Sequence, residues 1–380
     1  EHGPSGRLWR MKTAGSGRTS WGGMFLKLRR QQRNCGYAKT RWWLLPKDLC
    51  IREEIEKQEA KYLASYATLC TGSRGRLYPE DPCPVRTVFM RDRDRIIYSK
   101  AFRRLKHKTQ VFISPEGDHY RTRSTHTLEV SQISRTLARA LRLNEDLTEA
   151  IALGHDLGHT PFGHSGESAL NEIYPPGFRH NEQSLRVVDQ LEGERGLNLT
   201  WEVRDGILCH TGPRHPATLE GQIVRIADRI SYINHDIDDA IRAGIIEESD
   251  LPRDCVKILG NRHKARINTM VTDIIEKSWG KPEITMSDHV QVATDGLRSF
   301  LFEQVYIGSV AKKEEAKAQR IVKTLYEYYL ENPNLLTKEL KLKVSREGLE
   351  RCVVDYIAGM TDRFALKTFE KHFVPNAWMK

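Results

Sequence analysis

The sequence predicts an all-α fold, because apolar residues recur at helical steps along most of the chain after residue 50. The clearest case is residues 219–243, where six isoleucines follow one another at intervals of three or four, as on the buried face of one long helix. These are Ile223, Ile226, Ile230, Ile233, Ile237 and Ile241. The same spacing returns twice near the C-terminus, in Leu297, Leu301 and Val305 and then in Ile321, Leu325 and Tyr328.

Other helices are predicted in chain order at 51–65, 91–102, 124–142, 145–158, 181–192 and 201–209. Glycines and prolines between 72 and 84 indicate a loop after the first of them. Residues 109–122 hold β-branched and aromatic residues around Pro115-Glu116-Gly117-Asp118, a pattern that favours a small hairpin. Residues 252–380 are again helical in pattern but change in character, with a charge-dense stretch from Lys312 to Lys317.

Residues 1–50 differ from the rest of the chain in charge and in pattern. They carry 11 Lys or Arg and two acidic residues, a net charge of +9 out of +10 for the whole chain. They also hold four of the seven Trp and show no sustained period. Such a basic, acid-poor segment is similar to an organellar transit peptide, but we expect a disordered or non-native extension. The remaining 49 basic and 48 acidic residues do not indicate a general nucleic-acid-binding surface.

Length and cysteine usage limit the class of protein. A chain of 380 residues can bury one large core, or one core with an appended lobe. The seven cysteines are scattered and form no CxxC pair, which favours reduced thiols and a cytoplasmic protein. No stretch approaches the roughly 20 apolar residues of a membrane span, so we expect no membrane partner.

Titratable residues crowd two short segments, Arg123-Ser124-Thr125-His126 and His155 to Glu167. The second segment packs three His, one Asp and one Glu into 13 residues. Such crowding costs stability unless a metal or an anionic substrate neutralises it. His159 follows His155 by four residues, so we expect it on the same helical face as His155. The pattern therefore predicts a metal site.

The helix at 219–243 offers the missing ligand. Beside its isoleucines runs a second stripe of the same period, made of Arg225, Asp228, Tyr232, Asp236 and Asp239. In most amphipathic helices such a stripe faces solvent, although a Tyr among spaced carboxylates is unusual there. Asp228 would complete the set His126, His155, Asp156 and Asp228. Two imidazoles and two carboxylates with open positions suit Mn²⁺, Fe²⁺, Co²⁺, Ni²⁺ or Mg²⁺ better than a structural Zn²⁺.

These spacings resemble the HD-domain phosphohydrolases, and the longer strings resemble their deoxyguanosine triphosphate triphosphohydrolase-like branch. The matching strings are Phe102–Phe112, His126–Val130, His155–Glu167, His180–Arg186 and Arg225–Asp236. The resemblance extends from about Ile51 to about Gly244. It implies an HD-domain helical core at 51–250 with an appended C-terminal helical lobe at 251–380.

The resemblance also implies a reaction. Water would attack the α-phosphorus of a deoxynucleoside triphosphate, dGTP or several dNTPs, and release deoxynucleoside and triphosphate. A divalent metal would polarise the phosphate oxygens. By the resemblance, His164 paired with Glu167 does the acid–base work and His159 lies close to the α-phosphate. His180 is a weaker candidate for a phosphate contact.

Substrate-binding residues follow from the same comparison. Gln110, Tyr232 and Asp236 match positions that recognise the sugar in the wider family, and a Tyr ring under C2′ would leave no room for a 2′-hydroxyl. Arg229 matches a basic phosphate-binding position. Arg123 either clamps a phosphate or pairs with a nearby acid, and its place beside a ligand favours the clamp.

Two other classes of function stay open. One is another HD reaction, such as a 5′-nucleotidase, a phosphodiesterase or a guanosine-polyphosphate hydrolase. The other is a regulatory protein that binds nucleotide or single-stranded DNA. If the protein is an enzyme, single-stranded DNA or a dNTP can also bind it as an allosteric partner. A homo-oligomer is expected by the resemblance.

Five further histidines, His107, His119, His210, His215 and His235, are expected to be hydrogen-bonded structural or surface residues. Glu129 is either a partner of His126 or a helix charge.

Overall fold

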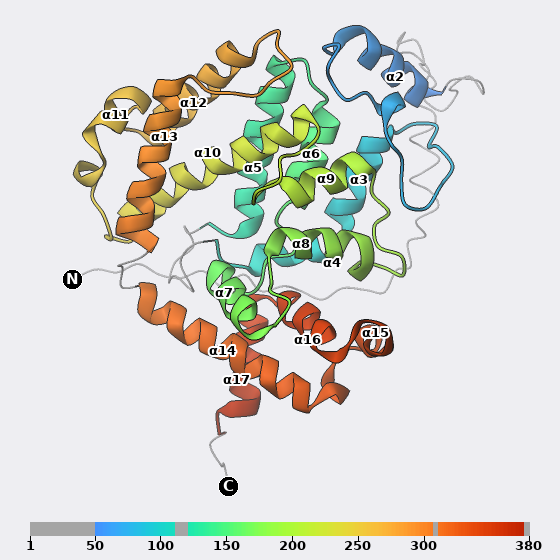
Figure 1. Cartoon of the computed structure of the whole chain (residues 1–380), viewed down its shortest axis with the longest axis vertical. Coiled ribbons are helices and arrows are strands. Elements are labelled where there is room, and N and C mark those ends of the chain that lie inside the picture. The colour runs from blue at the N-terminus through green and yellow to red at the C-terminus, as the bar shows by residue number, and fades with distance from the viewer. Residues whose placement is uncertain (1–49, 111–120, 307–310, 376–380) are drawn as a thin grey trace, which may run out of the picture. The chain divides into compact units, whose positions relative to one another are not determined.

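Helices make up almost all of the ordered structure in the described part of the chain (Figure 1). The computed structural model describes residues 50–110, 121–306 and 311–375. Within these ranges the fold is all-α, and the β-type pairs are the isolated bridges Arg76–Thr200 and Thr109–Thr122. The second bridge joins the two ends of the predicted hairpin, whose turn lies outside the described residues, as does the predicted extension before Cys50.

The helices of the first half of the chain are α2 Ile51–Tyr62, α3 Val88–Tyr98, α4 Lys100–Arg104, α5 Arg123–Ala140, α6 Glu145–Gly154, α7 Gly163–Ile173, α8 His180–Arg186, α9 Trp201–Cys209 and α10 Leu219–Arg242. Those of the second half are α11 Arg253–Leu259, α12 His263–Ser278, α13 Asp288–Leu301, α14 Ala311–Glu331, α15 Lys338–Glu347, α16 Leu349–Ala358 and α17 Asp362–Phe373. Short π-helical stretches at Val187–Leu191 and Phe302–Tyr306 extend α8 and α13. None of the described helices is long and apolar enough to cross a membrane.

The first apolar cluster, which we call the core cluster, forms around α10. The predicted isoleucine stripe of α10 is confirmed: Ile223, Ile230, Ile233 and Ile237 are fully buried, and Ile226 and Ile241 pack at its edge. Helices α5, α6 and α9 pack directly on α10, and α3 packs on α6 (Figure 1). Residues of α11, α12 and α13 join the same cluster, among them Leu259, Met270 and Leu297. Burial of this apolar surface fixes the helices that carry the titratable residues.

The second apolar cluster, which we call the C-terminal cluster, joins α7 to the last helices of the chain. Its buried members include Phe162, Leu170 and Tyr174 around α7, Leu325 of α14 and Ile357 of α16. Figure 1 shows α7, in green, beside the orange helix α14, and α14 in turn packs on the red helices α16 and α17. The division into domains at residue 250 stays a prediction, since apolar residues after it contribute to both clusters.

The chain leaves the helical path at the His-Asp doublet, so the expectation that His155 and His159 share one helix face is wrong. Helix α6 ends at Gly154, and the N–H of His159 donates to Asp156 O at 3.2 Å in a tight turn. The carbonyl of His155 instead accepts a hydrogen bond from the Ser184 hydroxyl at 2.7 Å. Pro161, which would clash with a helical carbonyl four residues earlier, keeps the helix from resuming at once.

Other helices also differ from the sequence prediction. The predicted helix 91–102 is interrupted at Ser99, whose hydroxyl caps α4 by accepting the N–H of Phe102. The predicted helix 181–192 changes to π-helix after Arg186. Helix α7 was not predicted, because Gly163, Ser165 and Gly166 are weak helix formers. Packing of its apolar face in the C-terminal cluster overrides that weak propensity.

Gly158 is required where the turn after α6 meets α8. Its N–H donates to Ser184 Oγ at 2.9 Å, and a Cβ at this position would lie 2.1 Å from the Ser184 backbone nitrogen. A Gly158→Ala variant should therefore push α8 away and lower the free energy of unfolding by about 1–3 kcal/mol, as overpacking does. Thermal or urea unfolding measures the change. Gly72→Ala is the matched control, because a Cβ there meets nothing within 4 Å. If Gly158→Ala is as stable as wild type, or if both variants lose the same free energy of unfolding, this account is wrong.

Candidate active site

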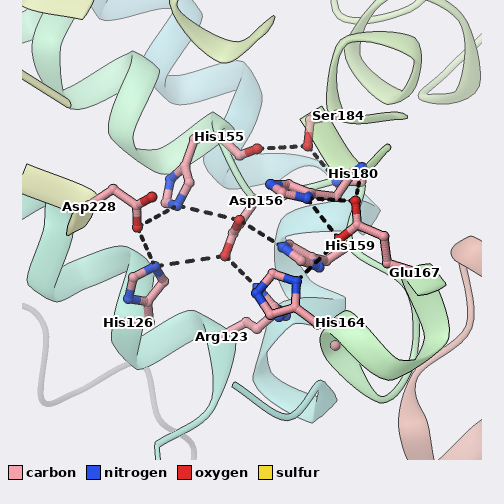
Figure 2. Close-up of polar contacts among 12 residues, drawn as sticks. Arg123, His126, His155, Asp156, His159, His164, Glu167, His180, Ser184 and Asp228 are labelled. Carbon is pink, nitrogen blue, oxygen red and sulfur yellow. Dashed lines mark hydrogen bonds and ion pairs between the residues drawn. The ribbon is translucent and has the colours of Figure 1, made fainter. Parts of the chain in front are cut away.

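The four predicted metal ligands come together at the meeting point of three segments (Figure 2). His126 comes from α5, His155 and Asp156 from the turn after α6, and Asp228 from α10. His126 Nε2 lies 3.0 Å from Asp228 Oδ1 and 3.9 Å from Asp156 Oδ2. His155 Nε2 lies 3.5 Å from Asp156 Oδ1 and 3.8 Å from Asp228 Oδ1. His126, His155 and Asp228 offer ligand atoms that all lie within 4.8 Å of one another, as the binding of a single cation requires, whereas Asp156 forms such a group with His159 and His180.

The hydrogen bonds of His155 leave a lone pair facing this point. Its Nδ1 donates to the carbonyl of Ala152 at 2.7 Å, so in the neutral ring Nε2 carries the lone pair. That Nε2 is buried and has no hydrogen-bond partner. An unpaired buried acceptor is costly, and a metal ion would satisfy it. The residues therefore fit a divalent cation.

His126 is held in the corresponding tautomer by a chain of hydrogen bonds. His235 Nδ1 donates to Asp236 Oδ1 at 3.0 Å, so neutral His235 accepts at Nε2 from His126 Nδ1 at 2.9 Å. Asp236 Oδ2 accepts the hydroxyl of Tyr306. His126 Nε2 then faces Asp228 Oδ1 with a lone pair, and either a proton or a cation must lie between them. In the metal-free protein the proton is favoured: burial lowers the pKa of His126, but the hydrogen bond to Asp228 outweighs it and raises the pKa.

A buried arginine neutralises the central carboxylate. Arg123 is 1% exposed, and its Nη1 donates to Asp156 Oδ2 at 2.8 Å. Burial raises the pKa of Asp156, but His155, His159 and Arg123 around it hold the pKa well below its ordinary value. Arg123 thus pairs with an acid, the second of the two predicted alternatives. Its Nε and Nη2 have no hydrogen-bond partner, so the phosphate-clamp role stays a prediction.

The predicted acid–base residues lie beside the four ligands, around one carboxylate. His164 is 76% exposed, and its Nδ1 lies 3.2 Å from Glu167 Oε2. His180 Nδ1 lies 2.9 Å from Glu167 Oε1, and the His180 backbone N–H donates to the same oxygen at 2.8 Å. Burial raises the pKa of Glu167, but the hydrogen bonds from both histidines hold it well below its ordinary range. Glu167 therefore stays ionised and orients two imidazoles.

His180 carries a positive charge in this arrangement. His210 Nδ1 donates to Ile207 O at 2.7 Å, and burial lowers the pKa of His210 to about 3, so its Nε2 accepts from His180 Nε2 at 3.2 Å. His180 then donates from both nitrogens, to His210 and to Glu167, and must be an imidazolium. Burial lowers its pKa, but the bond to Glu167 raises it above the ordinary value.

His159 lies between the ligands and the acid–base group. Its ring stacks on that of His180 with 4.0 Å between centroids, and its Nε2 lies 3.4 Å from Asp156 Oδ1. Burial and the nearby charges of Arg123 and His180 lower the pKa of His159 well below its ordinary value, so the ring is neutral. Its Nδ1 is buried and has no hydrogen-bond partner.

The predicted sugar-binding residues line up along α10 and beside the turn after α6. The second stripe of α10 does not face solvent: Asp236 is buried, and Tyr232 packs at the edge of the core cluster. Gln110 presents a buried Oε1 without a hydrogen-bond partner. Arg229 is half-buried, and its Nη1 lies 3.6 Å from Asp295 Oδ1. A phosphate bound by Arg229 would have to replace that ion pair.

Four residues of the site were not assigned to it from the sequence. His210 and His235 were expected to be structural histidines, and both are buried and hydrogen-bonded, but each contacts a residue of the site. His235 lies seven residues after Asp228, so helical spacing alone would have placed it on the same face. Arg298 of α13 contacts Tyr232, and Tyr306 of the π-helical extension contacts Asp236. No local pattern in the sequence links either residue to α10. Glu129, the predicted partner of His126 or helix charge, lies instead near His235, with 3.7 Å between Glu129 Oε2 and His235 Nε2. Its Oε1 accepts a hydrogen bond from Arg121.

Comparison with known proteins identifies the family of this chain. The HD-domain family model matches residues 123–233, and the phosphohydrolase-associated domain matches residues 284–371. A deoxyguanosinetriphosphate triphosphohydrolase-like protein from Caldanaerobacter subterraneus is 60% identical over 331 residues, which cover 87% of this chain and 98% of that protein. The protein of the same name from Desulfatibacillum aliphaticivorans is 51% identical, over 86% of this chain and 99% of its own. That from Clostridium tetani is 49% identical, over 86% and 97%.

The chain belongs to the deoxyguanosinetriphosphate triphosphohydrolase-like family of HD-domain phosphohydrolases. Its HD-domain match contains all four predicted metal ligands together with His159, His164, Glu167 and His180. The associated-domain match contains Arg298 and Tyr306 as well as α14, α15, α16 and most of α17. Residues of both matched domains therefore meet at the site of this family member.

Asp228 gives a direct test of the ligand set in this HD protein. Asp228→Asn keeps the shape of the side chain but removes its charge, so affinity for Mn²⁺ should fall by more than the roughly 10–100-fold that the loss of an outer partner costs. Titration calorimetry and the metal content after purification measure this. Asp238→Asn on the same helix is the control, since Asp238 faces Arg266 and Arg121 and should keep wild-type affinity. Equal affinity in both variants would exclude Asp228 as a ligand.

Proposed function

We propose that this protein hydrolyses deoxynucleoside triphosphates, dGTP or several dNTPs, to deoxynucleoside and triphosphate. The observation that supports this most strongly is the hydrogen-bonded group of His164, Glu167 and His180 beside two candidate metal-binding groups, His126 with His155 and Asp228, and Asp156 with His159 and His180. An HD site that only binds a nucleotide would not need an ionised carboxylate holding an exposed imidazole. The names of the relatives at 49–60% identity support the same substrate class.

A divalent cation would be held by His126, His155, Asp156 and Asp228. When bound, it would polarise a phosphoryl oxygen of the substrate and so make the phosphorus more electrophilic. The protein's own part is to keep both imidazoles in the ligand tautomer, through Ala152 for His155 and through His235 for His126. Mixed nitrogen and oxygen donors suit Mn²⁺, Mg²⁺, Fe²⁺, Co²⁺ or Ni²⁺.

Proton transfer is assigned to His164. Glu167 accepts the Nδ1 proton of His164 and so directs its Nε2 outward, where the ring is exposed to a bound substrate. In the imidazolium form, Nε2 can protonate the departing 5′-oxygen of the deoxynucleoside. Ionised Glu167 stabilises that imidazolium, as a carboxylate does for a general-acid histidine.

Positive charge for the triphosphate is supplied by neighbouring groups. Burial lowers the pKa of His180, but the hydrogen bond to Glu167 raises it and so favours the imidazolium form. Arg123 has two guanidinium nitrogens without a hydrogen-bond partner in the buried floor of the site. His159 offers a neutral Nδ1 without a partner, which can donate to an α-phosphate oxygen in one tautomer. Arg229 at the half-buried end of the site would contact the outer phosphates.

Sugar recognition is assigned to Gln110, Tyr232 and Asp236. The buried Oε1 of Gln110 is an acceptor without a donor, and a 3′-hydroxyl would supply one. Asp236 already accepts from Tyr306 and His235, which fixes its orientation for a further contact. The Tyr232 ring would fill the space at C2′ and exclude a 2′-hydroxyl.

We also propose that the enzyme acts in the cytoplasm and as a homo-oligomer, and that a dNTP or single-stranded DNA can modulate it. The cysteines in the described residues are all free thiols, which is typical of a reducing compartment. The family resemblance is the basis for the oligomer and for the modulators.

A product assay tests the proposed reaction against the other HD chemistries. The full-length protein is incubated with each dNTP, each NTP and a 5′-mononucleotide, with Mn²⁺ or Mg²⁺, and products are identified by mass. Release of intact triphosphate from dNTPs is expected. Release of phosphate or pyrophosphate instead would indicate a nucleotidase or a phosphodiesterase, and no turnover with tight nucleotide binding would indicate a regulatory protein.

Replacing His164 should separate proton transfer from metal binding. His164→Ala should lower kcat by about 10²–10⁴-fold, the usual contribution of general acid–base catalysis, while the metal content stays at the wild-type level. Steady-state kinetics and elemental analysis of the same preparation check both. His215→Ala, an exposed histidine outside the site, should leave both unchanged. A parallel loss of metal and rate in His164→Ala would instead make His164 a ligand.

Replacing Tyr232 should change the choice of sugar. Tyr232→Ala opens space at C2′, so the ratio of kcat/KM for dNTP over NTP should fall by about 10-fold or more, with a lower rate from looser positioning. Tyr232→Phe is the matched control, because it keeps the ring and should keep the ratio. The reading of Tyr232 as a steric gate is wrong if both variants discriminate as wild type does.

A further inference from the structure

The turn that carries His159 and His164 is tied to the C-terminal helices by hydrogen bonds that the proposed chemistry does not use. The backbone N–H of Phe162 donates to Asp362 Oδ1 at 2.9 Å. Asp362 is the first residue of α17, lies 200 residues further along the chain and is only 7% exposed. A buried carboxylate that accepts backbone N–H groups makes strong, charge-assisted hydrogen bonds.

Asp362 also holds the segment on the other side of this turn. Its Oδ2 accepts the backbone N–H of Thr109 at 2.8 Å and the Thr109 hydroxyl as well. Gln110, the proposed sugar contact, follows directly, and its carbonyl lies 3.3 Å from where a Cβ on Gly163 would be. One side chain therefore aligns the acid–base turn with the segment that presents Gln110.

A buried lysine makes a second connection of the same kind. Lys108 Nζ donates to the carbonyl of His159 and, at 2.8 Å, to the carbonyl of Ala358 at the end of α16. Lys108 is 2% exposed, and burial lowers its pKa to about 7. Both the ammonium and the amine have enough N–H groups for two carbonyls, so the connection holds in either form.

The turn needs such support because its backbone is in an unfavourable conformation. Phe162 has φ of +62° and Gly163 has φ of +57°. A non-glycine residue in the left-handed region costs on the order of 1–3 kcal/mol and persists only where the surroundings hold it there. The surroundings here are the Phe162 ring, buried in the C-terminal cluster, and the Asp362 carboxylate on its N–H.

The two functional groups of the site thus rest on different apolar clusters. The four metal ligands lie on α5, α10 and the end of α6, which pack in the core cluster. His164 and Glu167 lie on α7, which packs on α14 in the C-terminal cluster. Displacing the turn should therefore move the acid–base residues while the metal ligands stay in place.

We propose that Asp362, supported by Lys108, is a positioning residue through which the C-terminal helices hold His159 and His164 against the metal ligands. The kinetic part of this inference rests on the proposed function, and the structural part does not. Asp362 contacts neither the metal ligands nor the imidazoles, so it acts through the backbone of the turn.

Three variants of the full-length protein test this: Asp362→Ala, Asp362→Asn and, as control, Thr361→Ala. Asp362→Ala removes every acceptor, whereas Asp362→Asn keeps one oxygen for the N–H of Phe162. Thr361 is the N-cap of α17, where its hydroxyl accepts the N–H of Phe364, and it makes no hydrogen bond to the turn. Its loss weakens the same helix without touching the turn.

The readouts are amide hydrogen exchange of peptides covering residues 158–165, Mn²⁺ affinity by titration calorimetry, and kcat and KM with the best dNTP. Asp362→Ala should speed exchange in the turn and lower kcat by about 10–100-fold, as small misplacements of catalytic groups do. Mn²⁺ affinity should stay at the wild-type level. Asp362→Asn should fall between wild type and Asp362→Ala, and Thr361→Ala should match wild type in exchange and in kcat.

The inference is overturned if Asp362→Ala leaves exchange in the turn unchanged, if Thr361→Ala causes the same losses, or if Mn²⁺ affinity falls together with kcat. If Asp362→Ala does not fold, the comparison of Asp362→Asn and Lys108→Met with Thr361→Ala decides by the same readouts. Failure of the proposed function gives a different result: wild type would release no triphosphate from any dNTP, while exchange in the turn would still depend on Asp362.

Discussion

The buried ion pair between Arg123 and Asp156 is the interaction on which the site depends. Both side chains are almost fully buried, and an unpaired charge in either place would be prohibitive. The pair fixes the first turn of α5 against the turn after α6. The same alignment brings His126, one turn further along α5, to the imidazole of His155. Because the Asp156 carboxylate is paired with the Arg123 guanidinium, the charge of this predicted ligand is partly neutralised within the protein itself.

The His-Asp doublet works because α6 ends there. Neighbouring side chains on a helix point about 100° apart, which would carry one of them away from the cation. Ser184 accepts the N–H of Gly158 and donates to the carbonyl of His155, so α8 closes the turn and redirects Asp156 toward Asp228. The structure therefore explains the glycine in this segment by the close approach of α8. An uninterrupted helix, as the local pattern predicts, could not bring the four donors together.

The all-α fold could be predicted from the sequence, because it is recorded in local spacing, whereas the four metal ligands stay a prediction that the closeness of His126, His155 and Asp228 supports. The isoleucines of α10 fix its buried face, and the same period places Asp228, Tyr232 and Asp236 on another face of that helix. The contacts of His210 with His180 and of Tyr306 with Asp236 could not be predicted, since they join segments 30 and 70 residues apart without a shared pattern. Helix α7 was missed because tertiary packing, not propensity, holds it. The roles of the site residues in substrate binding and catalysis remain predictions.

The chain of hydrogen bonds from His126 through His235 and Asp236 to Tyr306 has a consequence for how such an enzyme can diverge. Each link fixes the direction of the next, so the basicity of one metal-facing nitrogen depends on a carboxylate assigned to the sugar. Under the proposed roles of Asp236 and His126, a substitution of Asp236 that admits another nucleotide would also change how strongly His126 Nε2 donates to a metal ion. The proposed assignment of these residues therefore makes the choice of nucleotide and the choice of metal ion linked traits of this fold.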